Sequence, residues 1–186
     1  MSNPFLNLRS TDSNQKSINW YQDQIKKIAR ITPNRLMTNR VDLVNSILPG
    51  NMYMFFYDAK NKDKLPYWDA FPLIIPFNKV DGGFYGINLH YLPYLQRFTL
   101  LGALHQYASD EKVPEKIKIQ VSWKILQSAS KTPQIRHCVK HYLNNNVSSK
   151  FLHIKYPDWI IASQLPVERF VGSTKQKIWE EGSRKY

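Results

Sequence analysis

Residues 51–93 read NMYMFFYDAKNKDKLPYWDAFPLIIPFNKVDGGFYGINLHYLP and decide the fold, because two apolar runs, 52–57 and 71–77, alternate with turn-forming residues. Short apolar runs between turns are typical of strands. Pro72 and Pro76 have no backbone N–H to donate, so the second strand is expected at a sheet edge. The turn Asp81-Gly82-Gly83 supplies the positive φ angles of a tight hairpin. The chain then returns as a third strand, which predicts a three-stranded antiparallel meander.

The sequence before and after the meander predicts helices that cover it. Ser17 is expected to cap a helix that ends before Pro33, and Pro93 is expected to begin a second helix that ends near Asp110. Residues 34–50 have no clean hydrophobic period, so they predict irregular structure or a short helix.

The C-terminal half is divided by prolines and asparagines. Residues 117–126 fit either a strand or a helix. Thr132-Pro133 predicts the start of a helix that ends at Asn144, and residues 147–156 are either a strand or its continuation. A further short helix is expected after Pro157.

Composition limits the class of protein. With 186 residues and 42% hydrophobic content, the chain is long and apolar enough for one buried core. No apolar run approaches the ~20 residues of a membrane-spanning helix, so no membrane partner is expected. One cysteine allows no internal disulfide, and residues 1–4 lack the features of a secretory signal, which favours synthesis in the cytoplasm. The sequence predicts an α+β fold, a small antiparallel β-meander covered by helices, with a single domain at residues 17–186 and an extended N-terminal arm at residues 1–16.

Four residues are candidates for contacts with other protein subunits. Phe5 and Leu6 are adjacent large apolar residues of the mostly polar arm, which is either a disordered tail or a segment ordered by a neighbour. Tyr67 and Trp68 follow a predicted turn loop, where one ring is expected to face a partner. The aromatic residues at 53–68 are alternatively core residues or rings that stack nucleobases.

The net charge of +12 is unevenly distributed along the chain. Residues 112–155 carry nine cations against Glu115 alone, a net charge of +8, and residues 9–40 carry seven cations against two acids, a net charge of +5. This segregation favours a polyanionic partner, because each neutralised phosphate releases counterions, although basic faces also dock acidic proteins. The candidate contacts with double-stranded DNA or another polyanion are Lys112, Lys116, Lys118, Lys124, Lys131, Arg136, Lys140, Lys150 and Lys155.

The sequence contains no recognisable motif for catalysis, a metal ion or a cofactor. His137 and His141 have the spacing of a zinc-binding pair on one helical face, but Cys138 stands where an HExxH motif has its glutamate. The glycines at 82–86 lack the spacing of a phosphate-binding loop, and the carboxylates near residue 60 lie beside lysines in an expected exposed turn. Neither a metal nor a cofactor is expected, and the protein is expected not to be an enzyme.

Three segments together resemble one protein family: FFYDAKNKDKLPYWDAFPLIIPF (residues 55–77), GGFYGINLHYLP (82–93) and LPVERFVGSTKQKIW (165–179). From about Asn19 onward the chain resembles small virion-associated proteins of T-even-like contractile-tailed bacteriophages, including phages of cyanobacteria and other marine hosts. The resemblance implies a protein that is made in the host cytoplasm and becomes part of the virion. It implies a place in the tail, baseplate or neck, or else on the packaged DNA ends, and it offers no catalytic residues to carry over.

Two functions follow from these observations. The first is a non-enzymatic structural component, an adaptor in the tail, baseplate or neck that binds other phage structural proteins within a symmetric assembly. The alternative is a basic DNA-binding protein that protects the packaged genome ends, which the charge of residues 112–155 favours. A nuclease or hydrolase is not favoured, because no motif for such chemistry is present.

Overall fold

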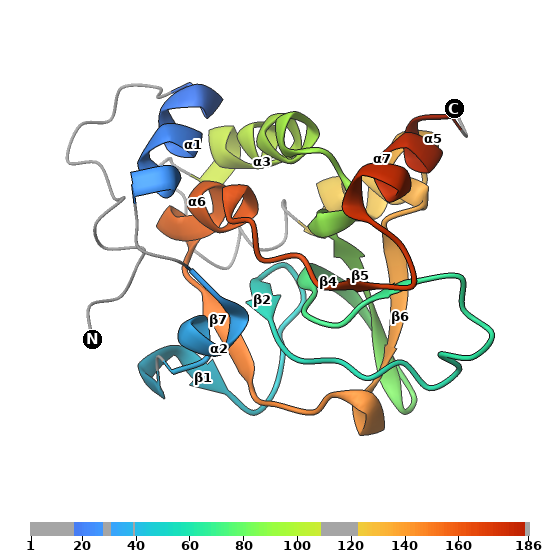
Figure 1. The fold of residues 1–186 in the computed structure, drawn as a ribbon. Coiled ribbons are helices and arrows are strands. Elements are labelled where there is room, and N and C mark those ends of the chain that lie inside the picture. Colours follow the sequence, from blue (N-terminus) through green and yellow to red (C-terminus); the bar gives the residue numbers. More distant parts are fainter. Residues whose placement is uncertain (1–16, 28–30, 39, 109–122, 185–186) are drawn as a thin grey trace.

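The computed structural model of the chain describes residues 17–27, 31–38, 40–108 and 123–184. Within these residues, a six-stranded sheet has the order β1-β7-β2-β4-β5-β6, and β3 and β8 form a separate two-stranded sheet. The paired strands are antiparallel. Their bounds are β1 (Leu43–Val44), β2 (Met52–Met54), β3 (Trp68–Asp69), β4 (Leu73–Val80), β5 (Gly83–Asn88), β6 (Val139–Leu143), β7 (Phe151–Ile154) and β8 (Phe170–Val171). Together with the helices, this arrangement confirms the predicted α+β class (Figure 1).

Helices gather along one side of the large sheet, as Figure 1 shows for α1, α3, α5, α6 and α7. The helix bounds are α1 (Ile18–Lys27), α2 (Pro33–Leu36), α3 (Tyr94–Ala108), α5 (Pro133–Arg136), α6 (Trp159–Gln164) and α7 (Lys175–Arg184). Residues 123–129 are also helical. None of the helices within the described ranges combines the length and apolar character needed to cross a membrane.

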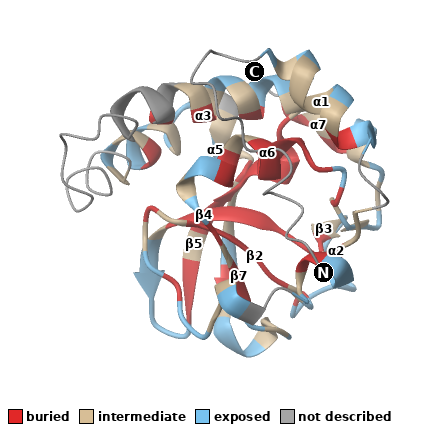
Figure 2. Ribbon diagram, turned by 90° about the vertical axis from the view of Figure 1, so that its left-hand side faces the viewer, coloured by how far each residue is buried: buried red, intermediate tan, exposed pale blue. Residues whose placement is uncertain are grey.

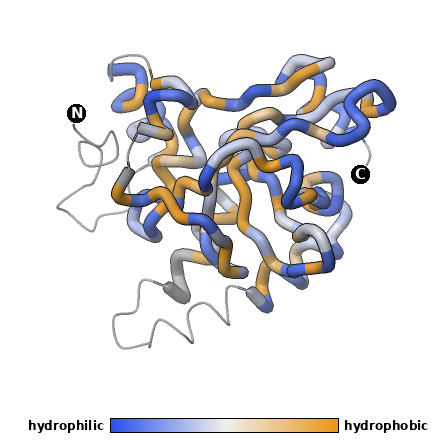
Figure 3. The backbone as a smooth tube through the Cα atoms, turned by 90° about the horizontal axis from the view of Figure 1, so that it is seen from below, coloured by the Kyte–Doolittle hydropathy of each residue, from blue (hydrophilic) through white to orange (hydrophobic). Residues whose placement is uncertain are grey.

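Apolar side chains are buried on both faces of the sheet, because successive side chains of a strand point to opposite faces. On the helix-covered face, strand residues such as Met54 and Ile87 pack in one cluster with Leu104 and Ile161. The other face carries a second, mainly aromatic cluster of Ile47, Tyr53, Phe55, Ile74, Phe84, Tyr142 and Phe151. Figure 2 shows the buried strands below the helices, and Figure 3 shows the hydrophobic segments running through the interior.

The predicted meander is present as the adjacent strands β2, β4 and β5, but its second strand is not at an edge. β4 lies in the centre of the sheet between β2 and β5. Pro72 precedes the strand, pairing with β2 ends at Ile74, and the register with β5 shifts just after Pro76. The two prolines therefore lie where the ladder with β2 has ended or the ladder with β5 is irregular, so their missing N–H groups leave the central strand intact. The hairpin turn is confirmed, with Gly82 at a φ of 71°.

The helix predicted to begin after Thr132 and reach Asn144 is wrong in extent. α5 ends at Arg136, and the edge strand β6 follows, paired with β5 over its whole length. Cross-strand pairing therefore outweighs the local helical spacing of apolar residues. Gly83 permits the close approach, because a Cβ at this position would collide with the carbonyl oxygen of Tyr142.

His137 and His141, whose spacing resembles that of a zinc-binding pair, consequently do not share a helical face. His137 ends α5, and its ring lies so close to Gly182 that an added Cβ there would be 2.6 Å from Nε2. His141 lies in β6 and stacks on Tyr85, with ring centroids 4.7 Å apart. The i, i+4 spacing does not bring both rings to one metal-binding face.

Several other boundaries agree with the sequence. Ser17 accepts a hydrogen bond from the backbone N–H of Trp20 (3.3 Å) at the start of α1, as expected of a cap. The strand alternative for residues 147–156 is the correct one, since this segment contains β7. The predicted arm, with its candidate contacts Phe5 and Leu6, lies outside the described residues.

Candidate functional site

Residues 57–70 form a closed loop beside the edge strand β6. The backbone N–H of Tyr57 donates to the carbonyl oxygen of Ala70 (3.1 Å), which joins the two ends of the loop. The backbone N–H of Asp58 donates to the carbonyl oxygen of Asn146 (2.9 Å), and Asn146 Nδ2 donates to the carbonyl oxygen of Asp58 (2.7 Å). A loop whose ends are joined and anchored in this way is a compact Ω-loop with a defined shape. We call it the 57–70 loop.

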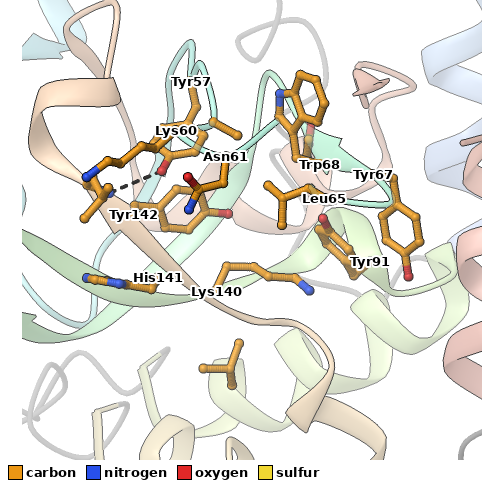
Figure 4. Close-up of a pocket in the computed structure, with 14 residues that line it drawn as sticks. Tyr57, Lys60, Asn61, Leu65, Tyr67, Trp68, Tyr91, Lys140, His141 and Tyr142 are labelled. Atoms are coloured by element: carbon orange, nitrogen blue, oxygen red, sulfur yellow. Dashed lines mark hydrogen bonds between the residues drawn. The ribbon is translucent and has the colours of Figure 1, made fainter. Parts of the chain in front are cut away.

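A cavity of about 340 Å³ lies between the 57–70 loop and β6, and we call it the aromatic pocket. The most deeply buried rings that line it are those of Tyr91 and Tyr142, and the half-buried rings are those of Tyr57, Tyr67 and Trp68. Its polar and apolar rim contains Lys60, Asn61 and Leu65 from the loop and Lys140 and His141 from β6 (Figure 4). A concave, ring-lined surface with a few polar groups is typical of a ligand-binding site.

Lys140 brings a positive charge to the buried side of the aromatic pocket. In the β5–β6 register it lies opposite Gly86, which has no side chain to cover it. Its Nζ lies 4.0 Å from the centroid of the Tyr91 ring, where the negative face of the ring attracts a cation. The charge is therefore held at a defined place beside the rings.

The deepest rings of the aromatic pocket remain neutral phenols. Burial raises the pKa of Tyr91, and the nearby charge of Asp69 raises it further. Burial likewise raises the pKa of Tyr142 well above its ordinary value. These two hydroxyl groups therefore add no negative charge to the pocket at neutral pH.

Among the described residues, one carboxylate lines the aromatic pocket, that of Asp69, and its charge is compensated by hydrogen bonds. Its Oδ2 accepts from His90 Nδ1 (2.7 Å) and Asn88 Nδ2 (3.1 Å), and its Oδ1 accepts from the backbone N–H groups of Phe71 (3.0 Å) and Arg169 (3.2 Å). Burial raises the pKa of Asp69, but the charge and hydrogen bond of His90 and the other donors outweigh burial and hold the pKa below its ordinary value. The side chains of Asp69 and His90 are 1% and 0% exposed. The pair is enclosed rather than open to a substrate.

The structure disperses the cations predicted to contact DNA. Lys112, Lys116 and Lys118 lie outside the described residues. Exposed cations on the segment that leads into β6 are Lys124, Lys131 and Arg136, and Lys140 lies on β6 itself. Lys150 and Lys155 flank β7, which three other strands separate from β6, and Lys155 pairs with Asp42 (3.1 Å). The first group of cations, residues 124–140, therefore leads along the chain to the pocket, whereas Lys150 and Lys155 lie on another part of the sheet. Contact of any of these cations with DNA remains a prediction.

Tyr67 and Trp68, one of whose rings was predicted to face a protein partner, both line the aromatic pocket. Tyr67 donates its O–H to Glu181 (3.2 Å), and its ring centroid is 6.1 Å from that of Tyr91. The buried indole N–H of Trp68 has no hydrogen-bond acceptor among the described residues, and the pairing of β3 with β8 holds the backbone of this residue. A contact of either ring with a protein remains a prediction.

Sequence reasoning missed Tyr91 and Tyr142 as site residues and did not connect Lys60 with Lys140. Tyr142 was missed because the apolar residues of 139–143 have helical spacing, which predicted a helix where the structure has β6. No local pattern could connect Lys60 with Lys140, because the 57–70 loop and β6 meet only in the folded chain.

Comparison with protein families places the chain among bacteriophage proteins. Residues 6–182 match the family described as Phage T4 terminal DNA protecting protein. The match covers nearly the whole sequence, and the chain therefore belongs to this family. No curated protein and no solved structure matches the chain.

This membership confirms the T4-like phage setting and corrects the function expected first. The family is described by the protection of terminal DNA, so the expectation of an adaptor in the tail, baseplate or neck is wrong. The alternative, a protein of the genome ends, agrees with the family. The adaptor expectation rested on the N-terminal arm and the aromatic loop, whereas the net charge of +12 agrees with the family.

Proposed function

We propose that the protein binds the ends of linear double-stranded phage DNA and shields them from nucleases. The observation that carries this proposal is the family match over residues 6–182. The net charge of +12 supports it, because neutralised phosphates release counterions and so favour binding. In this proposal the protein is made in the host cytoplasm and resides in the virion on the packaged genome.

Protection arises from occupancy of the end, without a chemical step. The side chains of Asp69 and His90 are enclosed, so they cannot reach a phosphodiester. Burial raises the pKa of the Cys138 thiol to about 12, which keeps it protonated and unreactive as a nucleophile. These groups support a binding protein rather than an enzyme.

Electrostatic attraction to the duplex comes from the cations around β6. Lys124, Lys131 and Arg136 are exposed and precede the strand, and Lys60 lies across the aromatic pocket on the 57–70 loop. Such contacts position a protein on the phosphate backbone without reading sequence. This suits a protein that must bind an end of any sequence.

Exonuclease digestion of a linear duplex tests the proposal. We expect the protein to preserve the full-length strand and a covalently closed circular duplex in equal mass to compete poorly, because it offers no ends. Effective competition by the circle would show binding along the duplex. Unprotected ends even at low salt, where phosphate contacts are strongest, would contradict the function.

A matched pair of variants locates the duplex-binding surface. Replacing Lys124, Lys131 and Arg136 by serine is expected to weaken binding to any DNA sequence and to reduce the salt slope by about 1 per lost phosphate contact. The control replaces Lys26, Lys27 and Arg35 by serine. These are exposed cations of α1 and α2, which lie at the left of Figure 1, whereas β6 lies at the right. Equal loss in both triple variants would show that net charge, rather than this surface, determines binding.

A further inference from the structure

We infer that the aromatic pocket holds the terminal nucleotide of a DNA strand, with the base against the pocket rings and a phosphate beside Lys140. This inference rests on the proposed end-binding function and identifies the part of the DNA that makes an end different from the interior of the duplex.

The lining of the aromatic pocket matches the flat, apolar faces of a base. Three rings, those of Tyr57, Tyr67 and Trp68, are only half-buried and leave ring surface accessible. Leu65, 41% exposed, adds apolar surface from the rim, and Figure 4 shows it between Trp68 and Tyr91. Bases of every identity stack on aromatic rings, so such a site holds a nucleotide without selecting its sequence.

The size of the aromatic pocket selects an end over the interior of the duplex. Its volume of about 340 Å³ is near the lower limit of ligand pockets, about 300–1,000 Å³, and suits one nucleotide rather than a base pair with its neighbours. An internal base must be unpaired and unstacked on both sides before it enters a pocket. A terminal base is stacked on one side only, and an overhanging base is unpaired already. The terminal nucleotide therefore enters at the least cost.

The charges around the aromatic pocket suit a phosphate beside that base. Lys140 places its Nζ 4.0 Å from the centroid of the Tyr91 ring, and Figure 4 shows Lys60 on the loop with its side chain extending toward the Tyr57 side of the pocket. The carboxylate found among the described lining residues is that of Asp69, which is hydrogen-bonded to His90 and Asn88 and has a side chain only 1% exposed. Among the residues that line the pocket, the charges open to an incoming phosphate are therefore positive.

The aromatic pocket is formed before any DNA binds. Hydrogen bonds between Asp58 and Asn146 and between Tyr57 and Ala70 hold the 57–70 loop, and the pairing of β3 with β8 holds its end. A preformed site loses little conformational entropy when its ligand binds. The rings and cations of the pocket therefore already have the positions in which they would contact the terminal nucleotide.

Comparing a linear duplex with a dumbbell duplex of the same sequence, closed by a hairpin loop at each end, tests the inference. The full-length protein is expected to bind the linear form more tightly, and this ratio of affinities is the end preference. Leu65→Trp fills the aromatic pocket from an exposed position, and Lys140→Met removes its cation while keeping an unbranched side chain. Each variant is expected to lower the end preference about tenfold, as loss of one stacked base would.

Two control variants make the same chemical changes elsewhere. Leu95→Trp alters a leucine that is 63% exposed on α3, and Lys27→Met removes an exposed cation of α1. Both are expected to keep the wild-type end preference. Pocket variants that fold, by circular dichroism, and retain that preference would overturn the inference while leaving end protection intact. Equal binding of both DNA forms by the wild-type protein would instead contradict the proposed function, and the inference with it.

A fluorescent base gives a second readout that does not depend on affinity. With 2-aminopurine at the terminal position, saturating wild-type protein is expected to change the emission, and Leu65→Trp is expected to remove most of that change. With the same base at the centre of the duplex, no change is expected. Unchanged terminal emission under saturating wild-type protein would overturn the placement of the base.

Discussion

The Arg97 guanidinium and the Glu168 carboxylate form a buried ion pair, with Nη2 2.7 Å from Oε1 and side chains 0% and 3% exposed. Arg97 also donates to the carbonyl oxygens of Leu92 (2.7 Å) and Ser163 (2.9 Å). The pair joins α3 to the segment between α6 and β8, and β8 in turn pairs with β3 at the end of the 57–70 loop. It therefore supports the aromatic pocket from a distance.

Replacing Arg97 by methionine is expected to destabilise the protein by about 3–5 kcal/mol, because Glu168 is left buried without its partner. Urea unfolding followed by circular dichroism measures the change. Lys175→Met is the control, since Lys175 lies 3.7 Å from the same carboxylate but is 42% exposed. Its loss should be about 1 kcal/mol or less. A similar loss of unfolding free energy in the two variants would show that the buried ion pair stabilises the protein no more than the exposed one.

Stability is expected to fall in acid through Asp69. Its folded-state pKa lies below the ordinary value of about 3.9, because the interactions of the carboxylate with His90 and other donors outweigh the effect of burial. A depressed pKa contributes stability above the unfolded-state value, and this contribution is lost as the pH falls through the folded-state value. Asp69→Asn should therefore flatten the dependence of the unfolding free energy on pH below about 4.

The exposed residue Asp58 supplies the control for the change from Asp to Asn. Its carboxylate pairs with Lys62 (2.9 Å), and the side chain is 62% exposed. Asp58→Asn makes the same chemical change at an exposed ion pair, and it should lower the unfolding free energy in urea by about 1 kcal/mol or less. If Asp69→Asn does not alter the dependence of the unfolding free energy on pH below about 4, this carboxylate does not couple stability to pH.

Two glycine-to-alanine substitutions are expected to have opposite effects. A Cβ at Gly83 would collide with the backbone of Tyr142, so Gly83→Ala should separate β5 from β6 and cost about 2–3 kcal/mol. Gly102 lies within α3 with nothing within 4 Å of an added Cβ, so Gly102→Ala should stabilise by about 0.5–1 kcal/mol. Thermal unfolding measures both changes. Destabilisation by Gly102→Ala would contradict the packing described for α3.

The thiol of Cys138 is expected to react slowly with iodoacetamide in the folded protein. Its side chain is buried, and burial raises its pKa to about 12, even though Lys140 and Arg97 act in the opposite direction. The thiolate is the reactive form, so little of it is available near neutral pH. Mass spectrometry should show rapid labelling in urea and slow labelling without it. Rapid labelling of the folded protein would contradict the enclosure of this residue.

The sequence by itself determined the features that depend on neighbouring residues. The alternation of apolar runs and turns predicted the strands β2, β4 and β5, and the glycine at position 82 predicted their hairpin. Capping and proline signals placed α1 and α3. Net charge pointed to a polyanion, and three local segments pointed to a phage family. Each of these signals is local or compositional, so it survives without knowledge of the fold.

Only the tertiary structure decided the features that depend on distant residues. Residues 139–143 became a strand because β5 offers a ladder of hydrogen bonds that outweighs their helical spacing. Arg97 meets Glu168 across 71 positions of sequence, and the 57–70 loop meets β6 across a similar distance. Burial of apolar surface drives such contacts, and it does not require any regular spacing of the residues in the sequence. The aromatic pocket, built entirely from them, was therefore visible only in the folded chain.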